Sequence, residues 1–187
     1  LAVQAGTIIQ AKRNCHGSSE ANTGETTGSS MSQVVVDIAQ MQVTENPADV
    51  LVTYSLGSCL GITVYDPQIQ VAGMVHCMLP LSKVDPSKAK ARPGMFVDTG
   101  VSLLLTTLFK MGARKSRIVI NVAGGAHVLN NENNMFKIGE RNFTVMRKIL
   151  WKNGLLMHVS DIGGTNSRTI RLHNDSGCFV IKTQGKE

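Results

Sequence analysis

A cysteine that follows two small residues is the first feature that could do chemistry. The stretch LGSCLGITVYDP runs from Leu56 to Pro67 and places Cys59 directly after Gly57 and Ser58. Small neighbours let the backbone and a substrate come close to a side chain, which a nucleophile needs and a core residue does not. A thiol becomes a good nucleophile when a neighbouring base forms the thiolate. We therefore expect a histidine near Cys59.

A predicted hairpin brings His76 close to Cys59. The segments 60–65 (LGITVY) and 71–79 (VAGMVHCML) are rich in β-branched and apolar residues, which is typical of strands. The DPQ sequence at 66–68 between them is turn chemistry. The two strands are therefore expected to pair antiparallel, with Cys59 at the start of one strand and His76 near the end of the other.

An imidazole that acts as a base needs a third group to fix its tautomer and orientation. Thr53 and Ser55 lie on or just after the preceding predicted strand and offer hydroxyl oxygens. Cys77 follows His76 directly, so its side chain is expected on the opposite face of the strand as a core residue. The spacing alone also fits a simpler interpretation, in which Cys59 and His76 are both buried core residues.

The remaining pattern predicts an α+β fold with mostly antiparallel strands. Two amphipathic helices are expected at 98–111, with Asp98 as N-cap, and at 140–152, covering one face of the sheet system. A long polar loop is expected at 82–93, where it could shape the mouth of a site. The expected strands are 33–42, 50–54, 60–65, 71–79, 117–123, 155–162, 169–173 and 178–182.

Residues 1–30 differ in composition from the rest of the chain. Their Gly, Ser, Thr and Asn content leaves too few apolar residues for a packed core, so we expect a flexible leader or upstream extension, followed by one domain at 31–187. The start lacks the sustained apolar core of a secretory signal. No CxxC pair is present among the four cysteines. Without a secretory signal, reduced thiols in a cytoplasm are expected.

The charge pattern narrows the expected partners. The net charge is +6, and the excess of Lys and Arg lies in the second half of the chain. The simplest interpretation is that most of these basic side chains are exposed to solvent. The chain has one Trp and two Tyr, without the basic and aromatic interleaving of RNA-binding proteins, so no nucleic-acid partner is expected. No apolar run reaches the length of a bilayer crossing, so no membrane insertion is expected.

Several short motifs together resemble one family. In order and spacing they are similar to the CheD family of chemoreceptor glutamine deamidases. The matching motifs are TYSLGSCLG at 53–61, YDP at 65–67, GMVHCMLP at 73–80, GGA at 124–126, IGERN at 138–142, and DIGG at 161–164 followed by RT at 168–169. Each motif alone is weak, whereas the whole series from about Val50 to Val180 is specific.

The resemblance implies a compact αββ sandwich and a catalytic triad in which Cys59 is the nucleophile, His76 the base and Thr53 the third member. It implies hydrolysis of selected chemoreceptor glutamine amides to glutamate through a cysteine thioester, and also hydrolysis of glutamyl methyl esters. A CheC-like phosphatase is an implied partner. The mechanism needs no metal and no organic cofactor.

The same mechanism needs groups that bind the developing negative charge and the substrate. Backbone N–H groups of the turn at Gly57, Ser58 and Cys59 are expected to form an oxyanion hole. Ser55 and Arg168 are further substrate-binding candidates, although Arg168 has an alternative structural role.

Two other chemistries fit the sequence less well. The DIGGTNSR sequence at 161–168 is similar to the phosphate loop of sugar kinases, but only nineteen residues follow it, so a strand-end turn is the simpler interpretation. A zinc site from His76 and three cysteines, Cys59, Cys77 and Cys178, lacks paired-ligand spacing.

A different class of function also stays open. The chain could be a chemotaxis adaptor without catalysis, which binds a CheC-like phosphatase or a receptor and acts by occupancy. The set of Thr53, Cys59 and His76 favours the enzyme, because an adaptor has no physical need for a thiol beside an imidazole.

Overall fold

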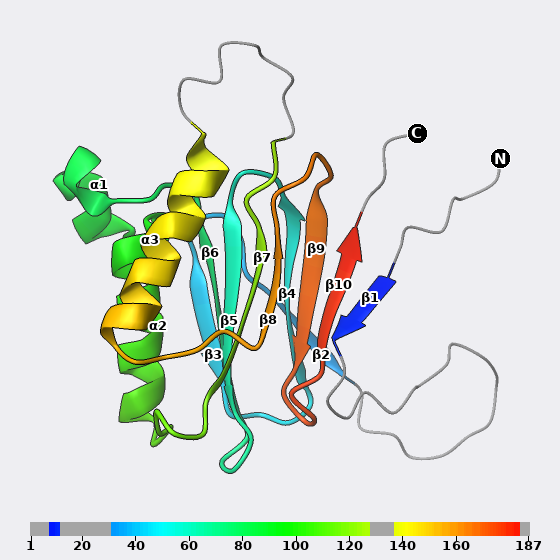
Figure 1. The fold of residues 1–187 in the computed structure, drawn as a ribbon. Helices are drawn as coiled ribbons and strands as arrows, with labels where there is room; N and C mark the ends of the chain where they lie inside the picture. The colour runs from blue at the N-terminus through cyan, green and yellow to red at the C-terminus, as the bar shows by residue number, and fades with distance from the viewer. Residues whose placement is uncertain (1–7, 12–30, 128–136, 184–187) are drawn as a thin grey trace, which may run out of the picture.

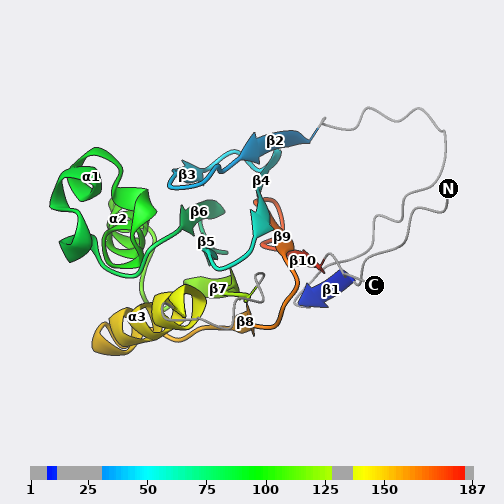
Figure 2. The same cartoon turned by 90° about the horizontal axis from the view of Figure 1, so that it is seen from above.

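Two sheets and a pair of helices form three layers (Figure 1). The structure is a computed structural model that describes residues 8–11, 31–127 and 137–183. One sheet lies in the middle, with the second sheet on one face and the helices on the other, as the view along the layers shows (Figure 2). The predicted α+β sandwich with mostly antiparallel strands is therefore confirmed.

The middle sheet contains the strand that follows Cys59 and the strand that carries His76. Its order is β3-β6-β5-β7-β8, and the strands are β3 (Met41–Thr44), β5 (Leu60–Asp66), β6 (Val71–Cys77), β7 (Val119–Gly124) and β8 (Val159–Ile162). The outer sheet has the order β1-β10-β9-β4-β2. Its strands are β1 (Ile8–Ala11), β2 (Ser32–Val35), β4 (Asp49–Leu56), β9 (Arg168–His173) and β10 (Phe179–Thr183).

Strands β5 and β6 form the centre of the molecule because both of their faces are covered. Every residue of both strands is buried, which explains their nearly continuous apolar sequences. One face packs on the outer sheet through Tyr65, Ala72 and Met74. The other face packs on the helices through Ile62 and Val75. Side chains that alternate along these two strands therefore enter two different cores.

Helices α2 (Val97–Lys110) and α3 (Ile138–Lys152) close the second core. Both bury one apolar face, as their sequence periodicity predicts. The predicted N-cap Asp98 is wrong, because the helix begins one residue earlier, with Phe96 as N-cap. The Asp98 carboxylate instead accepts hydrogen bonds from the backbone and hydroxyl of Ser82.

The single strand predicted at 33–42 is wrong, because the chain turns within it. Ala39 has a φ of 65°, and the Gln40 N–H donates to the Asp37 carbonyl. Strand β2 before this turn pairs parallel with β4 in the outer sheet. Strand β3 after it pairs antiparallel with β6 in the middle sheet. The turn thus lets one apolar segment contribute to both layers.

The expected polar loop at 82–93 contains a short helix, α1 (Pro86–Ala91), flanked by 3-10 turns at Ser82–Val84 and Pro93–Met95. The Asp85 carboxylate accepts from the backbone N–H of Lys88, and Pro86 is in the first turn. An acidic N-cap followed by proline is a helix-start signal. The expectation of an irregular loop is therefore wrong.

A short strand lies within the segment that the sequence predicts as a flexible leader. Residues Ile8–Ala11 form β1, which pairs antiparallel with β10 at the edge of the outer sheet. These four residues thus belong to the outer sheet, and their two isoleucines favour a strand. The rest of 1–30 lies outside the described residues, and a domain boundary at residue 31 stays a prediction.

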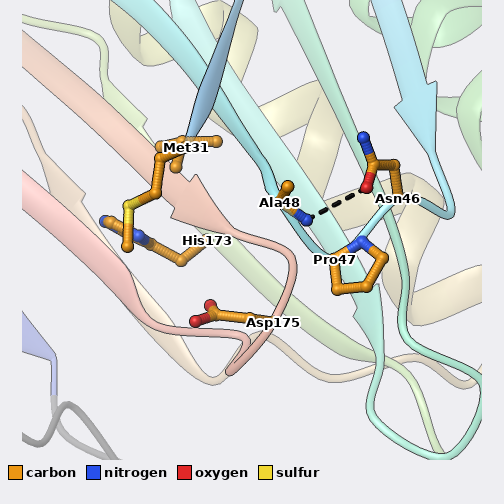
Figure 3. Close-up of a pocket in the computed structure, with 7 residues that line it drawn as sticks. Met31, Asn46, Pro47, Ala48, His173 and Asp175 are labelled. Atoms are coloured by element: carbon orange, nitrogen blue, oxygen red, sulfur yellow. Dashed lines mark hydrogen bonds between the residues drawn. The ribbon is translucent and has the colours of Figure 1, made fainter. Parts of the chain in front are cut away.

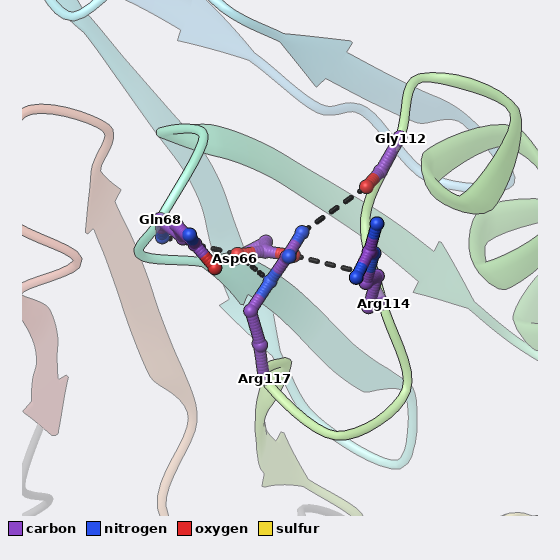
Figure 4. Close-up of polar contacts among 5 residues, drawn as sticks. All are labelled: Asp66, Gln68, Gly112, Arg114 and Arg117. Carbon is purple, nitrogen blue, oxygen red and sulfur yellow. Dashed lines mark hydrogen bonds and ion pairs between the residues drawn. The ribbon is translucent and has the colours of Figure 1, made fainter.

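A buried carboxylate ties the β5–β6 turn to the connection between α2 and β7. Asp66 accepts hydrogen bonds from the Arg117 guanidinium at 2.8–3.1 Å and from the backbone N–H of Arg114 and Gln68 (Figure 4). Burial acts to raise the pKa of Asp66, but these hydrogen bonds and the Arg117 charge lower it below its usual value. The YDP motif thus has a structural role at the end away from Cys59.

Candidate active site

The strand register places Cys59 and His76 on the same face of the middle sheet. Leu60 pairs with Cys77, and Gly61 pairs with His76. Extending the ladder by one residue puts Cys59 diagonal to His76, a separation that side chains can bridge. Cys59 is partly buried and packs against the core between the two sheets. The predicted hairpin is therefore confirmed.

Small residues beside His76 leave room for its ring. Its cross-strand neighbour is Gly61, and the next strand presents Ala123 at the same level. A Cβ built on Gly61 would lie 2.6 Å from the Ile170 side chain and 3.3 Å from that of Thr53. The two sheets therefore lie close together at this level, and a larger residue at position 61 would clash with the side chains of the outer sheet.

Thr53 and His76 form a hydrogen bond between the two sheets. The Thr53 hydroxyl lies 2.8 Å from His76 Nδ1, and both side chains are buried. The other ring nitrogen, Nε2, is also buried and has no hydrogen-bond partner among the described residues, Cys59 included. A buried polar atom without a partner requires an explanation, and a catalytic role is one of the few physical reasons for it.

Burial favours the neutral forms of both reactive groups. It raises the pKa of the Cys59 thiol, and the backbone N–H of the same residue offsets this only in part. It lowers the pKa of His76 to about 4, against a smaller raising effect of the Asp37 charge. In the resting protein at neutral pH, the pair is therefore a thiol and a neutral imidazole, not a thiolate and an imidazolium.

Glycines after β7 support the turn that carries Cys59. Gly124 has a φ of 118°, and a Cβ on it would lie 2.1 Å from the Cys59 carbonyl oxygen. Gly125 has a φ of 64° and packs against Gly139 at the start of α3, where a Cβ would lie 2.4 Å from the Gly125 carbonyl oxygen. The GGA and IGERN motifs thus meet at one close backbone contact beside Cys59.

All three carbonyl groups of the Gly57–Cys59 turn accept hydrogen bonds. The Gly57 carbonyl accepts from the Ala126 N–H at 2.8 Å, and that of Cys59 accepts from the Gly125 N–H at 2.8 Å. The Ser58 carbonyl accepts from the Asn142 side chain at 3.0 Å. Sequence reasoning did not select Asn142 as a site residue, although it lies in the IGERN motif.

Ser55 and Arg168 do not join the hydrogen bond between Thr53 and His76. Ser55 is exposed, has a φ of 54° and lies at an irregularity in the pairing of β4 with β9, between Thr53 and Leu56. Arg168 is buried, and its guanidinium donates to Asp161 at 2.9 and 3.0 Å and to the Asn166 carbonyl. Its donors hold the 161–168 turn, and a contact with substrate stays a prediction for both residues.

The glycines of the 161–168 turn explain its likeness to a phosphate loop. Gly163 and Gly164 have φ values of 84° and 69° between β8 and β9. The Gly163 N–H donates to the Gly124 carbonyl, and the Gly164 carbonyl accepts from the His127 N–H. The strand-end turn that the sequence predicts is therefore present, and it braces the glycines beside Cys59.

The cysteines have separate surroundings. Cys77 is buried on the helix side of β6, where its thiol lies 3.7 Å from the Phe96 carbonyl oxygen, so its predicted core role is confirmed. Cys59 and Cys77 are free thiols, whereas Cys178 is disulfide-bonded, so the expectation of reduced cysteines is wrong for Cys178. Across the described ranges, no three His, Cys, Asp or Glu side chains gather as a metal site would require.

A separate cavity of about 360 Å³ lies at the opposite end of β4 from Cys59. Pro47, Ala48, His173 and Asp175 are among its lining residues (Figure 3). Strand β4 begins at Asp49 beside this cavity and ends at Leu56, three residues before Cys59. The cavity therefore shares no residue with the set of Thr53, Cys59 and His76.

Comparison with known proteins identifies the family. A model of the CheD family, described as CheD chemotactic sensory transduction, matches residues 78–183. A Syntrophus aciditrophicus protein named probable chemoreceptor glutamine deamidase CheD 1 is 43% identical over 155 residues, covering 83% of this chain and 96% of that protein. The chain belongs to the CheD family.

Other CheD relatives agree with this assignment. A Solibacter usitatus protein named probable chemoreceptor glutamine deamidase CheD is 43% identical over 157 residues, covering 84% of this chain and 92% of that protein. A protein of the same name from Methanococcus maripaludis is 37% identical over 127 residues, covering 68% of this chain and 80% of that protein. The CheD family match begins at residue 78, after Thr53, Cys59 and His76, so the roles of these three depend on their geometry.

No helix in the described ranges combines the length and apolar character that crossing a membrane requires.

Proposed function

We propose that this CheD protein is a protein-glutamine deamidase that converts glutamine side chains of chemoreceptors to glutamate. The observation that carries the proposal is the buried hydrogen bond between Thr53 and His76 Nδ1, which leaves Nε2 without a partner on the face that Cys59 shares. The names of the CheD relatives support the choice of substrate.

The first half-reaction forms a thioester. His76 Nε2 removes the proton of the Cys59 thiol as the sulfur attacks the carboxamide carbon of the glutamine. The carbonyl π electrons move to oxygen, and backbone N–H groups of Ser58 and Cys59 stabilise the resulting oxyanion. The imidazolium then gives its proton to the leaving nitrogen, so that ammonia departs and the acyl group stays on sulfur.

The second half-reaction returns the enzyme to its starting state. Neutral His76 takes a proton from a water molecule that attacks the thioester carbonyl. The second tetrahedral intermediate collapses, the Cys59 sulfur leaves and regains the proton from His76, and a glutamate side chain is released. The net change is one water consumed and one ammonia released for each glutamine. Glutamyl methyl esters would react through the same steps, with methanol as the leaving group.

The neutral Cys59 thiol and His76 imidazole fit a mechanism in which the proton leaves the thiol as the sulfur attacks. With the pKa of His76 at about 4, the imidazole is available as a base throughout the neutral range. The Thr53 hydroxyl oxygen accepts a hydrogen bond from Nδ1–H, and this tautomer leaves the lone pair of Nε2 free to face the thiol. A threonine adds no negative charge, so it orients the ring without stabilising the imidazolium as an aspartate would.

The proposal extends to the setting of the enzyme. We place the deamidase domain at 31–187 and the protein in the cytoplasm, where the glutamine-bearing helical region of a chemoreceptor would be its substrate. A CheC-like phosphatase is a proposed partner. Gly57, Ser58, Ser55 and Arg168 are proposed to border the oxyanion or the substrate.

The test is incubation of the full-length protein with the cytoplasmic region of a chemoreceptor that carries glutamines at its modification sites. Mass spectrometry of the receptor and an ammonia assay should give one ammonia for each glutamine converted. The matched control is the same receptor with those glutamines replaced by glutamate, which should release no ammonia. Binding of both receptors without any conversion would instead favour the adaptor.

A further inference from the structure

A buried asparagine connects the two chain segments that carry the proposed nucleophile and base. Asn142 lies on the inner face of α3, and its side chain is completely buried. Its amide nitrogen donates to the Ser58 carbonyl at 3.0 Å and to the Met78 carbonyl at 2.9 Å. Ser58 directly precedes Cys59, and Met78 follows His76 by two residues. Both protons of one amide group are therefore used to hold the two segments together.

The hydrogen bond to Ser58 also sets the direction of a backbone N–H group. A trans peptide is planar, so its N–H points away from its C=O. The Ser58 carbonyl points toward Asn142, and the Cys59 N–H of the same peptide therefore points to the opposite side. The Gly57 carbonyl is held by Ala126 in the same way, which directs the Ser58 N–H. Among the described residues, neither N–H donates to a backbone carbonyl.

We propose that Asn142 is a positioning residue for the oxyanion hole, acting through the Ser58 carbonyl on the N–H of Cys59. This inference rests on the proposed deamidase function and adds to it a residue that does not touch substrate. Donors aimed at developing charge are effective because their orientation is fixed before the reaction begins. Asn142 supplies that fixed orientation to the Ser58–Cys59 peptide, between the Gly57 and Cys59 carbonyls that Ala126 and Gly125 hold.

The chemistry of the asparagine side chain fits this role better than a packing role. Its Oδ1 is buried without a hydrogen-bond partner among the described residues, which destabilises the fold. An apolar residue would remove that unfavourable group but could not hold either carbonyl. Helix α3 is well suited to carry the amide, because Gly139, one turn earlier, packs directly on the Gly125 backbone.

The experiment compares Asn142→Ala and Asn142→Ser with wild type, using the full-length protein and a glutamine-bearing receptor fragment. Met146→Ala is the matched control, because Met146 is equally buried one turn later on α3 and touches neither carbonyl. All four proteins are assayed well below their thermal midpoints. The readouts are kcat and KM for deamidation, and the rate of iodoacetamide alkylation of Cys59, followed on its own peptide by mass spectrometry.

Alkylation separates oxyanion stabilisation from a general disturbance of the site. The thiolate attacks iodoacetamide at a saturated carbon, so no oxyanion forms in that reaction. A turned Cys59 N–H then affects alkylation only through its contribution to the pKa of the thiol, which is smaller than that of burial. We expect the two Asn142 variants to lose about 10- to 100-fold in kcat, with KM and alkylation within about twofold of wild type. Met146→Ala should keep the wild-type kcat.

Three results would overturn the inference, and one of them also overturns the proposed function. Unchanged kcat in both Asn142 variants, beside an active wild type, rejects the inference alone. An equal loss of kcat and alkylation rate also rejects it, because Asn142 would then support the Cys59 and His76 geometry in general. A wild-type protein that converts no glutamine rejects the deamidase, and the positioning role falls with it.

Discussion

The Thr53 hydroxyl lies 2.8 Å from His76 Nδ1 and joins the outer sheet to the middle sheet inside the core. Thr53 belongs to β4 and His76 to β6, which are not neighbours in either sheet. Their contact depends on the packing of one sheet on the other, because Gly61 lets the sheets approach at this level. The orientation of the proposed base is thus a property of the sandwich and not of one hairpin.

Replacing Thr53 by valine should reduce kcat by about 10- to 100-fold with little change in KM, because valine keeps the shape and removes the oxygen that orients His76. Thr53→Ser keeps a hydroxyl and should retain most activity. Both losses should be smaller than those of Cys59→Ala and His76→Ala, which remove the reacting groups. Steady-state kinetics on a receptor fragment measures all four variants, and equal losses in Thr53→Val and His76→Ala would contradict an orienting role.

Burial of neutral His76 should make stability depend on pH between about 6.5 and about 4. The pKa of His76 in the folded protein is about 4, below its ordinary value of 6.5, so the unfolded chain binds the proton first as pH falls. Stability should therefore decrease over this window, by about 3 kcal/mol in total. The His76→Gln variant has no imidazole to take up this proton, so its free energy of unfolding should decrease less than that of wild type over the same window.

Urea unfolding of wild type and His76→Gln at about pH 7.5 and about pH 4.5 measures this difference. The loss in free energy of unfolding between the two pH values is compared for wild type and variant. Their difference cancels the contribution of the carboxylates, which both proteins share. Parallel losses of stability in wild type and variant would show that His76 does not titrate with a lowered pKa.

The Cys59 thiol should react slowly with iodoacetamide at neutral pH. Burial raises its pKa, so the rate should increase with pH through a midpoint above the ordinary value of 9.0. A resting thiolate and imidazolium pair would instead give a plateau that begins at acidic pH. Quantifying the alkylated Cys59 peptide across pH, with Cys59→Ala as the blank, distinguishes the two states.

A methyl group at Gly124 should disturb the Cys59 turn, because it would lie 2.1 Å from the Cys59 carbonyl oxygen. We expect Gly124→Ala to lower kcat by about 100-fold, the effect of a misplaced reacting group. Gly163→Ala is the control: its φ of 84° is also positive, but nothing lies within 4 Å of the added carbon. Should both variants lose the same activity in the deamidation assay, backbone strain and not the contact with Cys59 would be the cause.

Much of the fold could be predicted because local patterns and tertiary structure agree in β5, β6, α2 and α3. The turn at Ala39 could not, since a non-glycine residue at a φ of 65° leaves no mark in the sequence. Helix α1 was missed because its side chains are exposed and carry no apolar periodicity. Its Asp85 and Pro86 start signal was the available indication.

The hairpin pairing and the family resemblance were enough to select Cys59, His76 and Thr53. Asn142 was not selected, because its role depends on where α3 meets the turns after β4 and β6, which no local pattern encodes. Arg168 looked like a substrate contact in sequence, whereas its partner Asp161 lies seven residues away across a turn. The conformation of the turn decides whether these two side chains meet, and the sequence alone does not give that conformation.

The most direct test of the account is the receptor mass shift produced by Cys59→Ala and by Cys77→Ala. The two thiols lie near each other in sequence, but Cys59 faces the sheet interface and Cys77 the helices. Wild type and Cys77→Ala should add about one mass unit per converted glutamine, and Cys59→Ala should add none. Conversion by Cys59→Ala at the wild-type rate would show that Cys59 is not the nucleophile.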